Sequence, residues 1–322
     1  MRGSANRRPS RSFVPAWRTS TSTSSAKTVT RSPDRRARVS AVTTRPRTLP
    51  TGLGRTIRLG LARARYEIRS YFRAPDQVFF TFLFPVLLLT IFSVAFGEDA
   101  VMQANPQDPG IPMAEYYVPG LAAAGILLSG VQNLGVDIAV ERSDGTLKRL
   151  AGAPLPVFSY FLGKFGQVLV TSLAQTVLLL VVAATVFSVE LPTDGGRWAS
   201  FAWIYLAAVA TSAILGIAIS ALPRSGKSAT AVIVPPLLVL QFISGSYLSF
   251  TTLPDWLQNT ASVFPLKWIA QGMRAVFLPS GFEEAEVNGS WDLGGVALVL
   301  GIWLVVGLVA CRFGFRWIRR DS

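Results

Sequence analysis

The polar residues that most clearly predict an interaction form a charged run between two long apolar stretches. The run reads Glu141-Arg-Ser-Asp-Gly-Thr-Leu-Lys-Arg-Leu150, and a segment rich in Gly, Ala and Pro continues it to residue 156. Its glycine permits a backbone turn that other residues disfavour. A short, charged, glycine-containing connection between two apolar segments is a candidate site for a second protein to contact a membrane domain.

A second polar motif has the composition of a phosphate-binding loop but lacks its context. Residues 221–228 read Ala-Leu-Pro-Arg-Ser-Gly-Lys-Ser, with alanine where the first glycine of that loop belongs. In a true phosphate loop, backbone amides wrap the phosphates where a strand meets a helix. Here an apolar stretch precedes the motif and Pro223 interrupts it. We therefore expect a basic loop that binds no ATP.

Enzymatic chemistry and metal binding are both disfavoured by the composition. The chain has no histidine, and its single cysteine, Cys311, cannot form an internal disulfide or a cysteine cluster. Metal sites of the common kind use several His or Cys ligands, and general-base catalysis most often uses histidine. We therefore expect no catalytic residue, no metal and no cofactor in this chain.

The positions of these motifs are set by long stretches without charge. Only 15% of the 322 residues are charged, whereas a soluble domain carries about 25%. About 20 apolar residues in a helix cross a bilayer, and six uncharged blocks reach that length. The sequence therefore predicts an all-α polytopic membrane protein with a six-span domain over 76–318. The expected spans are about 77–97, 116–140, 160–188, 198–222, 229–250 and 293–313, with the charged loop at 141–156.

The net charge of +13 is unevenly distributed over the connections between these spans. The segment before the first span, the 141–149 and 223–227 loops and the C-terminal tail are rich in Arg and Lys, while the alternate loops hold mostly Asp and Glu. Basic residues remain on the cytoplasmic side during insertion. We therefore expect a protein of the cell's cytoplasmic (inner) membrane with both termini inside, and the basic excess to contact lipid headgroups instead of nucleic acid.

The first 75 residues divide into two parts. Residues 1–50 are rich in Arg, Ser, Thr and Pro and almost lack large apolar side chains, so they are expected to be disordered. The segment 51–75 has apolar residues at helical spacing and arginines on much of its remaining surface, which predicts an amphipathic helix in the membrane interface. It is either a simple anchor or also a contact for a cytoplasmic partner. The residues that define it are Ile57, Leu61, Ile68, Arg58, Arg65 and Arg69.

The outer segment 253–282, before the last span, predicts two short amphipathic helices, each too short to cross a bilayer. Trp256 and Trp268 suit the aromatic belt of a membrane interface. Two arrangements fit: a re-entrant cap over an exit path, or a hairpin that lies on the membrane surface. The residues assigned to this outer cap are Pro254, Trp256, Pro265, Trp268 and Arg274.

Taken together, residues 55–320 resemble the membrane subunits of ABC-2-type ABC exporters, nearest to the drug-resistance permeases of the daunorubicin type. The resemblance rests on the run 141–150, with Pro154 and Gly163-Lys164 downstream, and on Leu253-Pro254, Pro265 and Arg274 in the outer segment. The run is similar to a family stretch with a Gly-Thr-Leu core. Six spans, inner termini and an interfacial entry helix agree with it. The chain departs from the family pattern at Ser143-Asp144 and Ala153-Pro154.

This resemblance implies a dimer of six-span subunits, most simply a homodimer, each docked on a separate ATPase that holds ATP and magnesium. The run would be the coupling helix: its charged side chains would form charge-assisted contacts with the ATPase, its two leucines would be apolar anchors, and its glycine would form a turn. An ordinary basic loop is the alternative. The residues concerned are Glu141, Arg142, Asp144, Gly145, Thr146, Leu147, Lys148, Arg149 and Leu150.

The function expected from these features is export of an amphiphilic, drug-like or lipid-like molecule. Most of the expected spans carry no charge in their centres, which favours such a cargo over an ion. Two other functions remain open: an ion-coupled secondary transporter that needs no ATPase, and a membrane scaffold that transports nothing.

Overall fold

The structure, a computed structural model, describes residues 52–96, 101–104, 110–153 and 155–314. The expected disorder of 1–50 and the basic residues after 314 lie outside the described residues. Six helical stretches are long and apolar enough to cross a membrane. This finding confirms the prediction of an all-α polytopic membrane protein. The spanning helices are α2 (Pro75–Val78), η1 (Phe79–Leu83) and α3 (Phe84–Phe96); α4 (Met113–Leu127), η2 (Leu128–Asn133) and α5 (Leu134–Ser143); α7 (Val157–Val186); α8 (Gly195–Ile219); α9 (Gly226–Ile243); and α12 (Leu293–Gly314).

Two parts of the spans, η1 and η2, are turns of π-helix inside the first and second spans. The remaining elements lie outside the spans, and among them a two-residue antiparallel pair of strands was not predicted. The elements outside the spans are α1 (Leu53–Tyr71), β1 (Val101–Met102), β2 (Ile111–Pro112), α6 (Thr146–Ala151), η3 (Phe250–Thr252), α10 (Asp255–Ser262), α11 (Pro265–Phe277) and η4 (Phe282–Ala285).

The largest difference from the predicted spans is at the end of the fifth span. It was expected at residue 250, but α9 ends at Ile243. The physical reason is Gly245, whose φ of +76° is left-handed and ends the helical path. The next six residues form a turn and an irregular segment before η3 begins at Phe250, so lack of charge alone overestimated the length of this helix.

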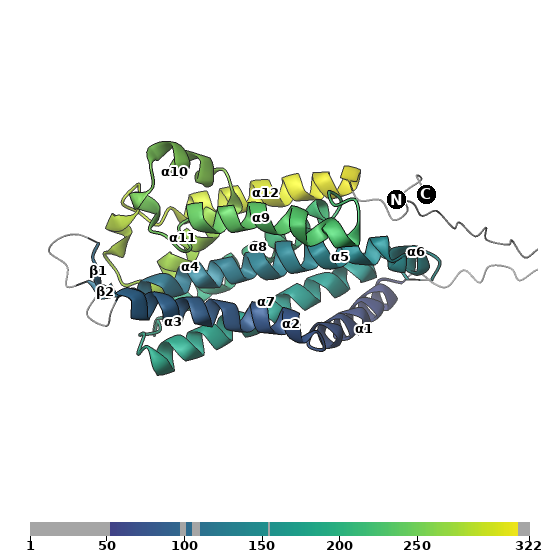
Figure 1. Cartoon of the computed structure of the whole chain (residues 1–322), viewed down its shortest axis with the longest axis horizontal. Coiled ribbons are helices and arrows are strands. Elements are labelled where there is room, and N and C mark those ends of the chain that lie inside the picture. Colours follow the sequence, from purple (N-terminus) through teal and green to yellow (C-terminus); the bar gives the residue numbers. More distant parts are fainter. Residues whose placement is uncertain (1–51, 97–100, 105–109, 154, 315–322) are drawn as a thin grey trace, which may run out of the picture. The chain divides into compact units, whose positions relative to one another are not determined.

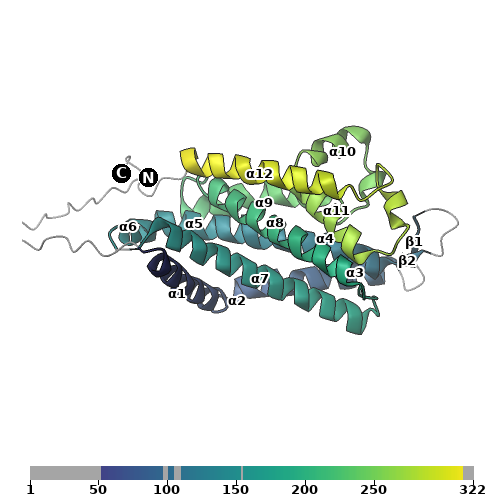
Figure 2. The ribbon, with the colours of Figure 1, turned by 180° about the vertical axis from the view of Figure 1, so that it is seen from behind.

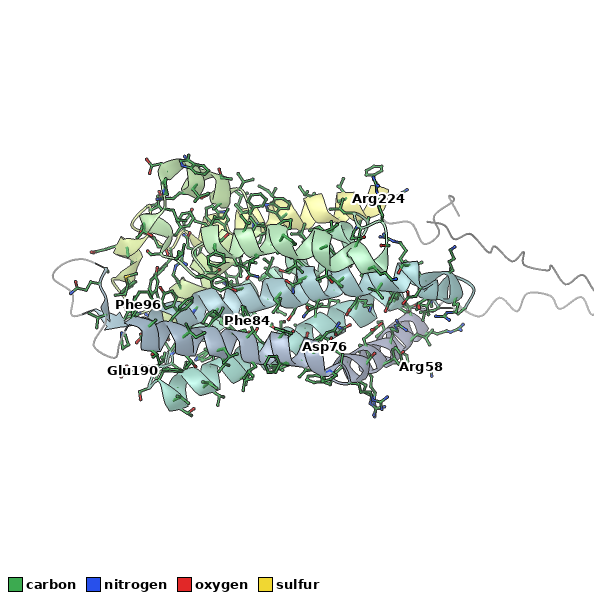
Figure 3. All side chains as sticks on the ribbon, in the orientation of Figure 1. Arg58, Asp76, Phe84, Phe96, Glu190 and Arg224 are labelled. Atoms are coloured by element: carbon green, nitrogen blue, oxygen red, sulfur yellow. The ribbon has the colours of Figure 1, made fainter. Side chains whose placement is uncertain are left out.

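The two ends of the helical bundle carry different short elements. Figures 1 and 2 show α1 and α6 at one end, and β1, β2, α10 and α11 at the other. We call them the α6 end and the α11 end. Figure 3 places the labelled Arg58 and Arg224 at the α6 end, and Phe96 and Glu190 at the α11 end. The bundle therefore separates the charged run from the outer segment by the length of its spans.

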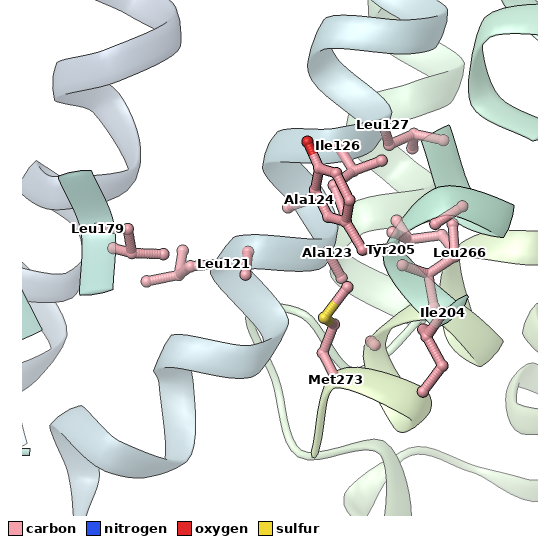
Figure 4. Close-up of a cluster of buried hydrophobic side chains, with 14 of the residues drawn as sticks. Leu121, Ala123, Ala124, Ile126, Leu127, Leu179, Ile204, Tyr205, Leu266 and Met273 are labelled. Atoms are coloured by element: carbon pink, nitrogen blue, oxygen red, sulfur yellow. The ribbon is translucent and has the colours of Figure 1, made fainter. Parts of the chain in front are cut away.

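The core of the bundle lies where α4, α8 and α11 meet. In Figure 4, Ala123 of α4 lies near Met273 of α11 and Ile126 of α4 lies near Tyr205 of α8, and all four side chains are buried. Helix α4 is almost completely enclosed by other helices, whereas few residues of α3 and α12 are buried. The second span is thus the central helix, and the first and last spans are peripheral.

Small residues allow two helices of this core to approach closely. Gly216 of α8 faces Gly130 of η2, and a Cβ added to Gly216 would overlap the Gly130 carbonyl oxygen. Membrane helices commonly use such small residues at their contacts, because packing supplies most of the association energy in lipid. This contact fixes the distance between the second and fourth spans.

We predict that Gly216→Ala destabilises the protein, because the added methyl group overlaps a backbone atom that cannot rotate away. Overpacking of this kind costs about 1–3 kcal/mol, measurable as a lower thermal unfolding midpoint in detergent. Gly301→Ala in α12 is the matched control, since nothing lies within 4 Å of its added Cβ. An equal midpoint for both variants would show that the α8–η2 contact is not close.

Candidate functional site

The charged run is mostly helical, with a sharp turn in its middle. Helix α5 continues through Ser143, and Asp144 caps it; α6 begins at Thr146. Between them Gly145 adopts φ +74°, a left-handed conformation that side chains disfavour. The second span therefore extends without a break into this turn, which we call the α5–α6 turn (141–151).

Three residues of the α5–α6 turn face their own chain. The Arg142 guanidinium donates hydrogen bonds to the Ser220 carbonyl at 2.6 Å and to the Pro223 carbonyl at 3.0 Å, which satisfies acceptors at the end of α8. Leu147 is completely buried. The contact of Leu147 with a partner stays a prediction; in this structure the chain itself encloses its side chain, as it does that of Glu141 through the contacts described below.

The remaining residues of the run form its outer surface. Asp144, Lys148 and Arg149 are exposed, and Arg149 donates a hydrogen bond to the Thr146 hydroxyl at 3.0 Å. Gly145, Thr146 and Leu150 are partly buried. The surface available to another protein is therefore mainly charged, with Leu150 as its one partly exposed large apolar side chain.

Glu141 belongs to a buried group of charges that joins three helices. Lys164 of α7 is 1% exposed, and its Nζ lies 2.7 Å from Oε1 of Glu141 and 3.1 Å from Oε2 of Glu67 in α1. Arg63 of α1 pairs with both carboxylates, and the Tyr160 hydroxyl donates to Glu141 Oε2 at 2.7 Å. We call these five residues the ion cluster. It ties α1, α5 and α7 together directly beside the α5–α6 turn.

The ion cluster was not predicted from the sequence, although two of its residues stand at unusual positions there. Glu67 is an acid within an arginine-rich segment and stands four residues after Arg63, and Lys164 interrupts the third apolar stretch near its start. Charges in such places are costly unless they are paired. Their pairing partner could not be identified from sequence spacing, since Lys164 and Glu67 are 97 positions apart.

Helix α1 presents three different faces. Gly60, Ala64, Glu67 and Tyr71 are buried, and the closest neighbour of α1 is α7. The predicted apolar stripe is largely exposed, with Ile57 at 42% and Leu61 at 62%, and Ile68 is partly buried. Arg58, Arg65 and Arg69 are exposed on a third side. An apolar face next to a basic face is the arrangement expected of a helix in a membrane interface, but the contact with α7 uses different residues.

Helix α11 of the outer segment is enclosed by protein. Eleven of its 13 residues are buried, including Pro265, and it packs against α4, α8 and α12. This burial favours the re-entrant arrangement over a hairpin on the surface. Helix α10, which Pro254 precedes, is more exposed, and its Trp256 side chain is 68% exposed. The partly buried Trp268 of α11 links the two helices, because its indole donates a hydrogen bond to the Ser262 carbonyl at 2.8 Å.

A second buried ion pair fixes α11 to the segment that follows it. Nε of Arg274 lies 2.6 Å from Oε1 of Glu286, and Nη1 donates to the Gly245 carbonyl at 3.2 Å. Burial disfavours the charged form of Arg274, but the neighbouring Glu286 and Tyr116 together outweigh this effect and raise its pKa. Burial lowers the pKa of Lys267 to about 8. Arg274 is therefore a structural residue of the outer segment.

The comparison with known proteins identifies the family. The family model described as "ABC-2 type transporter" matches residues 61–278, which is well over half of the chain. The chain belongs to the ABC-2 type transporter family. The match begins inside α1 and ends just after α11, so it contains the ion cluster, the α5–α6 turn and the re-entrant segment of this ABC-2 chain.

Several curated ABC-2 relatives are distant in sequence. The probable multidrug ABC transporter permease YbhR of Escherichia coli is 23% identical over 59% of this chain, and the chain spans only about half of its length (50%). The probable doxorubicin resistance ABC transporter permease protein DrrC of Mycobacterium tuberculosis is 24% identical over 69% of this chain and 78% of its own length. The inner membrane transport permease YadH of Escherichia coli is 22% identical over 66% of this chain and 80% of its own length.

We predict that Lys164→Met lowers the free energy of unfolding by about 3–5 kcal/mol, because it leaves two carboxylates beside a single cation. Thermal unfolding in detergent measures the loss. Lys227→Met, which removes an exposed lysine at the same end, should change stability by less than about 0.5 kcal/mol. In a double-mutant cycle with Glu141→Gln, additive effects would rule out the Lys164–Glu141 interaction.

Proposed function

We propose that this chain is the membrane-spanning permease subunit of an ATP-driven exporter. The observation that carries the proposal is the α5–α6 turn: a charged, exposed turn that continues a central membrane span and is linked by the ion cluster to two other helices. In a member of the ABC-2 family, such a turn is the best candidate to receive motion from a separate ATPase. ATP and magnesium would bind to that ATPase and not to this chain.

Docking of the ATPase would use the outer surface of the turn. Asp144, Lys148 and Arg149 are exposed and suit charge-assisted hydrogen bonds, with Leu150 as an apolar contact. A push on the turn would move α5 directly, and the ion cluster would carry the same displacement to α1 and α7. Gly145 would permit the sharp turn between α5 and α6.

A second permease subunit, most simply another copy of this chain, would complete the transporter. The first and fifth spans offer apolar surface for it: Leu87 and Ile91 of α3, and Val239 and Phe242 of α9, are exposed. Membrane lipids would cover the remaining apolar faces, and the basic side of α1 would contact their headgroups.

The cargo would be amphiphilic, drug-like or lipid-like. A cavity of about 180 Å³ lies between the first, second and fifth spans, and its lining is mostly apolar. Gln132 and Gln241 add amide groups, and Phe80, Phe84 and Tyr247 add aromatic rings. Ligand sites of this composition bind apolar molecules and orient them through a few polar groups.

The α6 end would face the cytoplasm, with both chain termini on that side. Among the described residues, this end carries the exposed Arg58, Arg65, Arg69, Lys148 and Arg224, whereas Glu115, Glu190, Asp194 and Glu283 lie in or near the connections of the α11 end. Positive residues are retained on the cytoplasmic side of the inner membrane. The α11 end would then be the side of cargo release.

We predict that reversing two charges of the turn, Lys148→Glu with Arg149→Glu, uncouples the permease. The new negative charges would repel acidic groups of the ATPase that the native side chains would contact, and binding of the ATPase should weaken about tenfold or more. The measurement is the amount of ATPase that copurifies with the permease from native membranes, together with the thermal midpoint of the permease.

The matched control for that prediction is Arg224→Glu, an exposed charge reversal at the same end but outside the turn. It should retain the ATPase. Full recovery of the ATPase with the double variant, at an unchanged midpoint, would exclude Lys148 and Arg149 as docking residues.

The orientation predicts opposite labelling of two engineered cysteines in intact cells. In a Cys311→Ser background, Thr193→Cys should react with a membrane-impermeant maleimide, because its loop would face outward. Lys227→Cys should react only after the membrane is opened. The reverse pattern would place the α6 end outside and contradict the proposed coupling.

A further inference from the structure

The apolar cavity between the first, second and fifth spans contains an amide whose orientation is fixed by the protein. No charged side chain of the described residues lines this cavity, and its amides are those of Gln132 in η2 and Gln241 in α9. Gln241 is 5% exposed, and its Oε1 accepts a hydrogen bond from the Tyr247 hydroxyl at 2.5 Å. In a cavity with few polar groups, the direction of each group decides what the cavity can bind.

The hydroxyl of Tyr247 determines which end of the Gln241 amide faces it. A tyrosine hydroxyl carries one proton, and no acceptor among the described residues other than Gln241 receives the proton of Tyr247. If the amide turned over, its Nε2 would face the hydroxyl, and the hydroxyl proton would be buried without an acceptor, which is costly. Oε1 therefore points to Tyr247, and Nε2 points away from it.

Tyr247 can fix this orientation because its own ring is held in place. The ring is 5% exposed and lies edge-on to Phe242 with centroids 5.2 Å apart, and its centroid is 6.4 Å from that of Phe92. The turn that carries it begins at the left-handed Gly245, whose carbonyl accepts a hydrogen bond from Arg274. Protein contacts therefore set the position of the hydroxyl without a ligand.

The other end of the Gln241 amide can bind a ligand. Its Nε2 has no hydrogen-bond partner among the described residues, and protein atoms do not close it off, so it opens into the cavity that the residue lines. The amide of Gln175 in α7 differs, because both of its polar atoms are unpaired and enclosed by protein. Gln241 therefore gives the cavity a hydrogen-bond donor in a fixed direction.

We propose that Gln241 is a specificity-determining residue, and that the cavity takes the flat, uncharged ring system of a molecule that carries a hydrogen-bond acceptor such as a ketone oxygen. Nε2 would donate to that oxygen, and the rings of Phe80, Phe84 and Tyr247 would pack against the ring system. The volume of about 180 Å³ suits one or two fused rings, since a cavity of about 150 Å³ binds benzene. A charged group would have no counter-ion in the lining.

The same hydrogen bond explains how the cavity would discriminate between molecules of one shape. A hydrocarbon of that shape would also fit, but it would displace water from Nε2 without replacing the lost hydrogen bond. This inference deepens the proposed function, because it names a chemical class of cargo. That the ligand is transported rests on the proposed function, whereas binding of a ring ketone does not.

The test uses the purified full-length chain in detergent without nucleotide, and it compares two molecules of equal shape. 2-Acetylnaphthalene carries a ketone oxygen, and in 2-isopropenylnaphthalene a methylene group replaces that oxygen. Isothermal titration calorimetry gives both affinities, and the ratio of ketone to hydrocarbon affinity is compared between variants. Partition into the micelle is the same for every variant, so a change in this ratio reports the protein alone.

Two variants separate the donor from the residue that orients it. Gln241→Leu removes the donor at similar volume and should lower the ratio about fivefold, the value of one uncharged hydrogen bond, while the hydrocarbon still binds. Tyr247→Phe keeps the donor but lets the amide turn over, so the ratio should fall about twofold as half of the amides face the wrong way. Asn259→Leu, which removes an exposed amide of α10 outside the cavity, should keep the native ratio.

The possible results distinguish the parts of the proposal. It is overturned if the native chain binds neither molecule saturably, or if Gln241→Leu has the native ratio. If Gln241→Leu shows no thermal unfolding transition, the ratio of Tyr247→Phe decides, and an unchanged ratio there contradicts the orienting role of Tyr247. Ketone binding that depends on Gln241, in a chain without ATP-driven transport, would support this inference and contradict the proposed function alone.

Discussion

The need to pair Lys164 constrains the α6 end of the molecule. An ammonium group that is 1% exposed needs carboxylates beside it, and those of Glu67 and Glu141 come from two other helices. Removing one partner of a buried pair costs about 3–5 kcal/mol, several times the value of an exposed ion pair. Helix α1 is therefore more than an amphipathic segment attached to lipid. It is fixed to α7 by charge and by the close approach of Gly60 to Leu162, and the α5–α6 turn begins from this fixed point.

The middle of the bundle is held together in a different way. There the contacts are apolar or made by small residues, such as Gly125 against the Gln175 side chain and Gly216 against Gly130. The π-helical turns η1 and η2 meet through uncharged hydrogen bonds, with Asn133 donating to the Thr81 hydroxyl at 2.9 Å. Apolar contacts have little directional preference, and π-helical turns are frequent at functional sites. The middle of the bundle is thus held by close packing and uncharged hydrogen bonds, and the α6 end by paired charges.

The membrane spans could be predicted from the sequence, whereas most contacts between the spans could not. Lack of charge over about 20 residues is a strong local signal, because a charge at the centre of a bilayer is costly. It failed only where a backbone conformation decided the outcome, as at Gly245 after α9. The ion cluster could not be foreseen, since it joins residues about 100 positions apart. The resemblance implied that Glu141 and Leu147 contact an ATPase, and a run this short carries no local signal for which of its side chains face the chain itself.

Buried ion pairs occur in this chain where a helix that does not span the membrane must be fixed. At the α6 end, Glu67 ties α1 to α7, and at the α11 end, Arg274 ties α11 to Glu286, the residue after η4. Near the ends of the spans, charged groups can remain close to water, so pairing them there is less costly than in the middle. A re-entrant or interfacial helix lacks the length that holds a true span across the bilayer. Specific ion pairs supply the missing constraint, which explains why charges lie at these two joints while the spans between them use uncharged contacts.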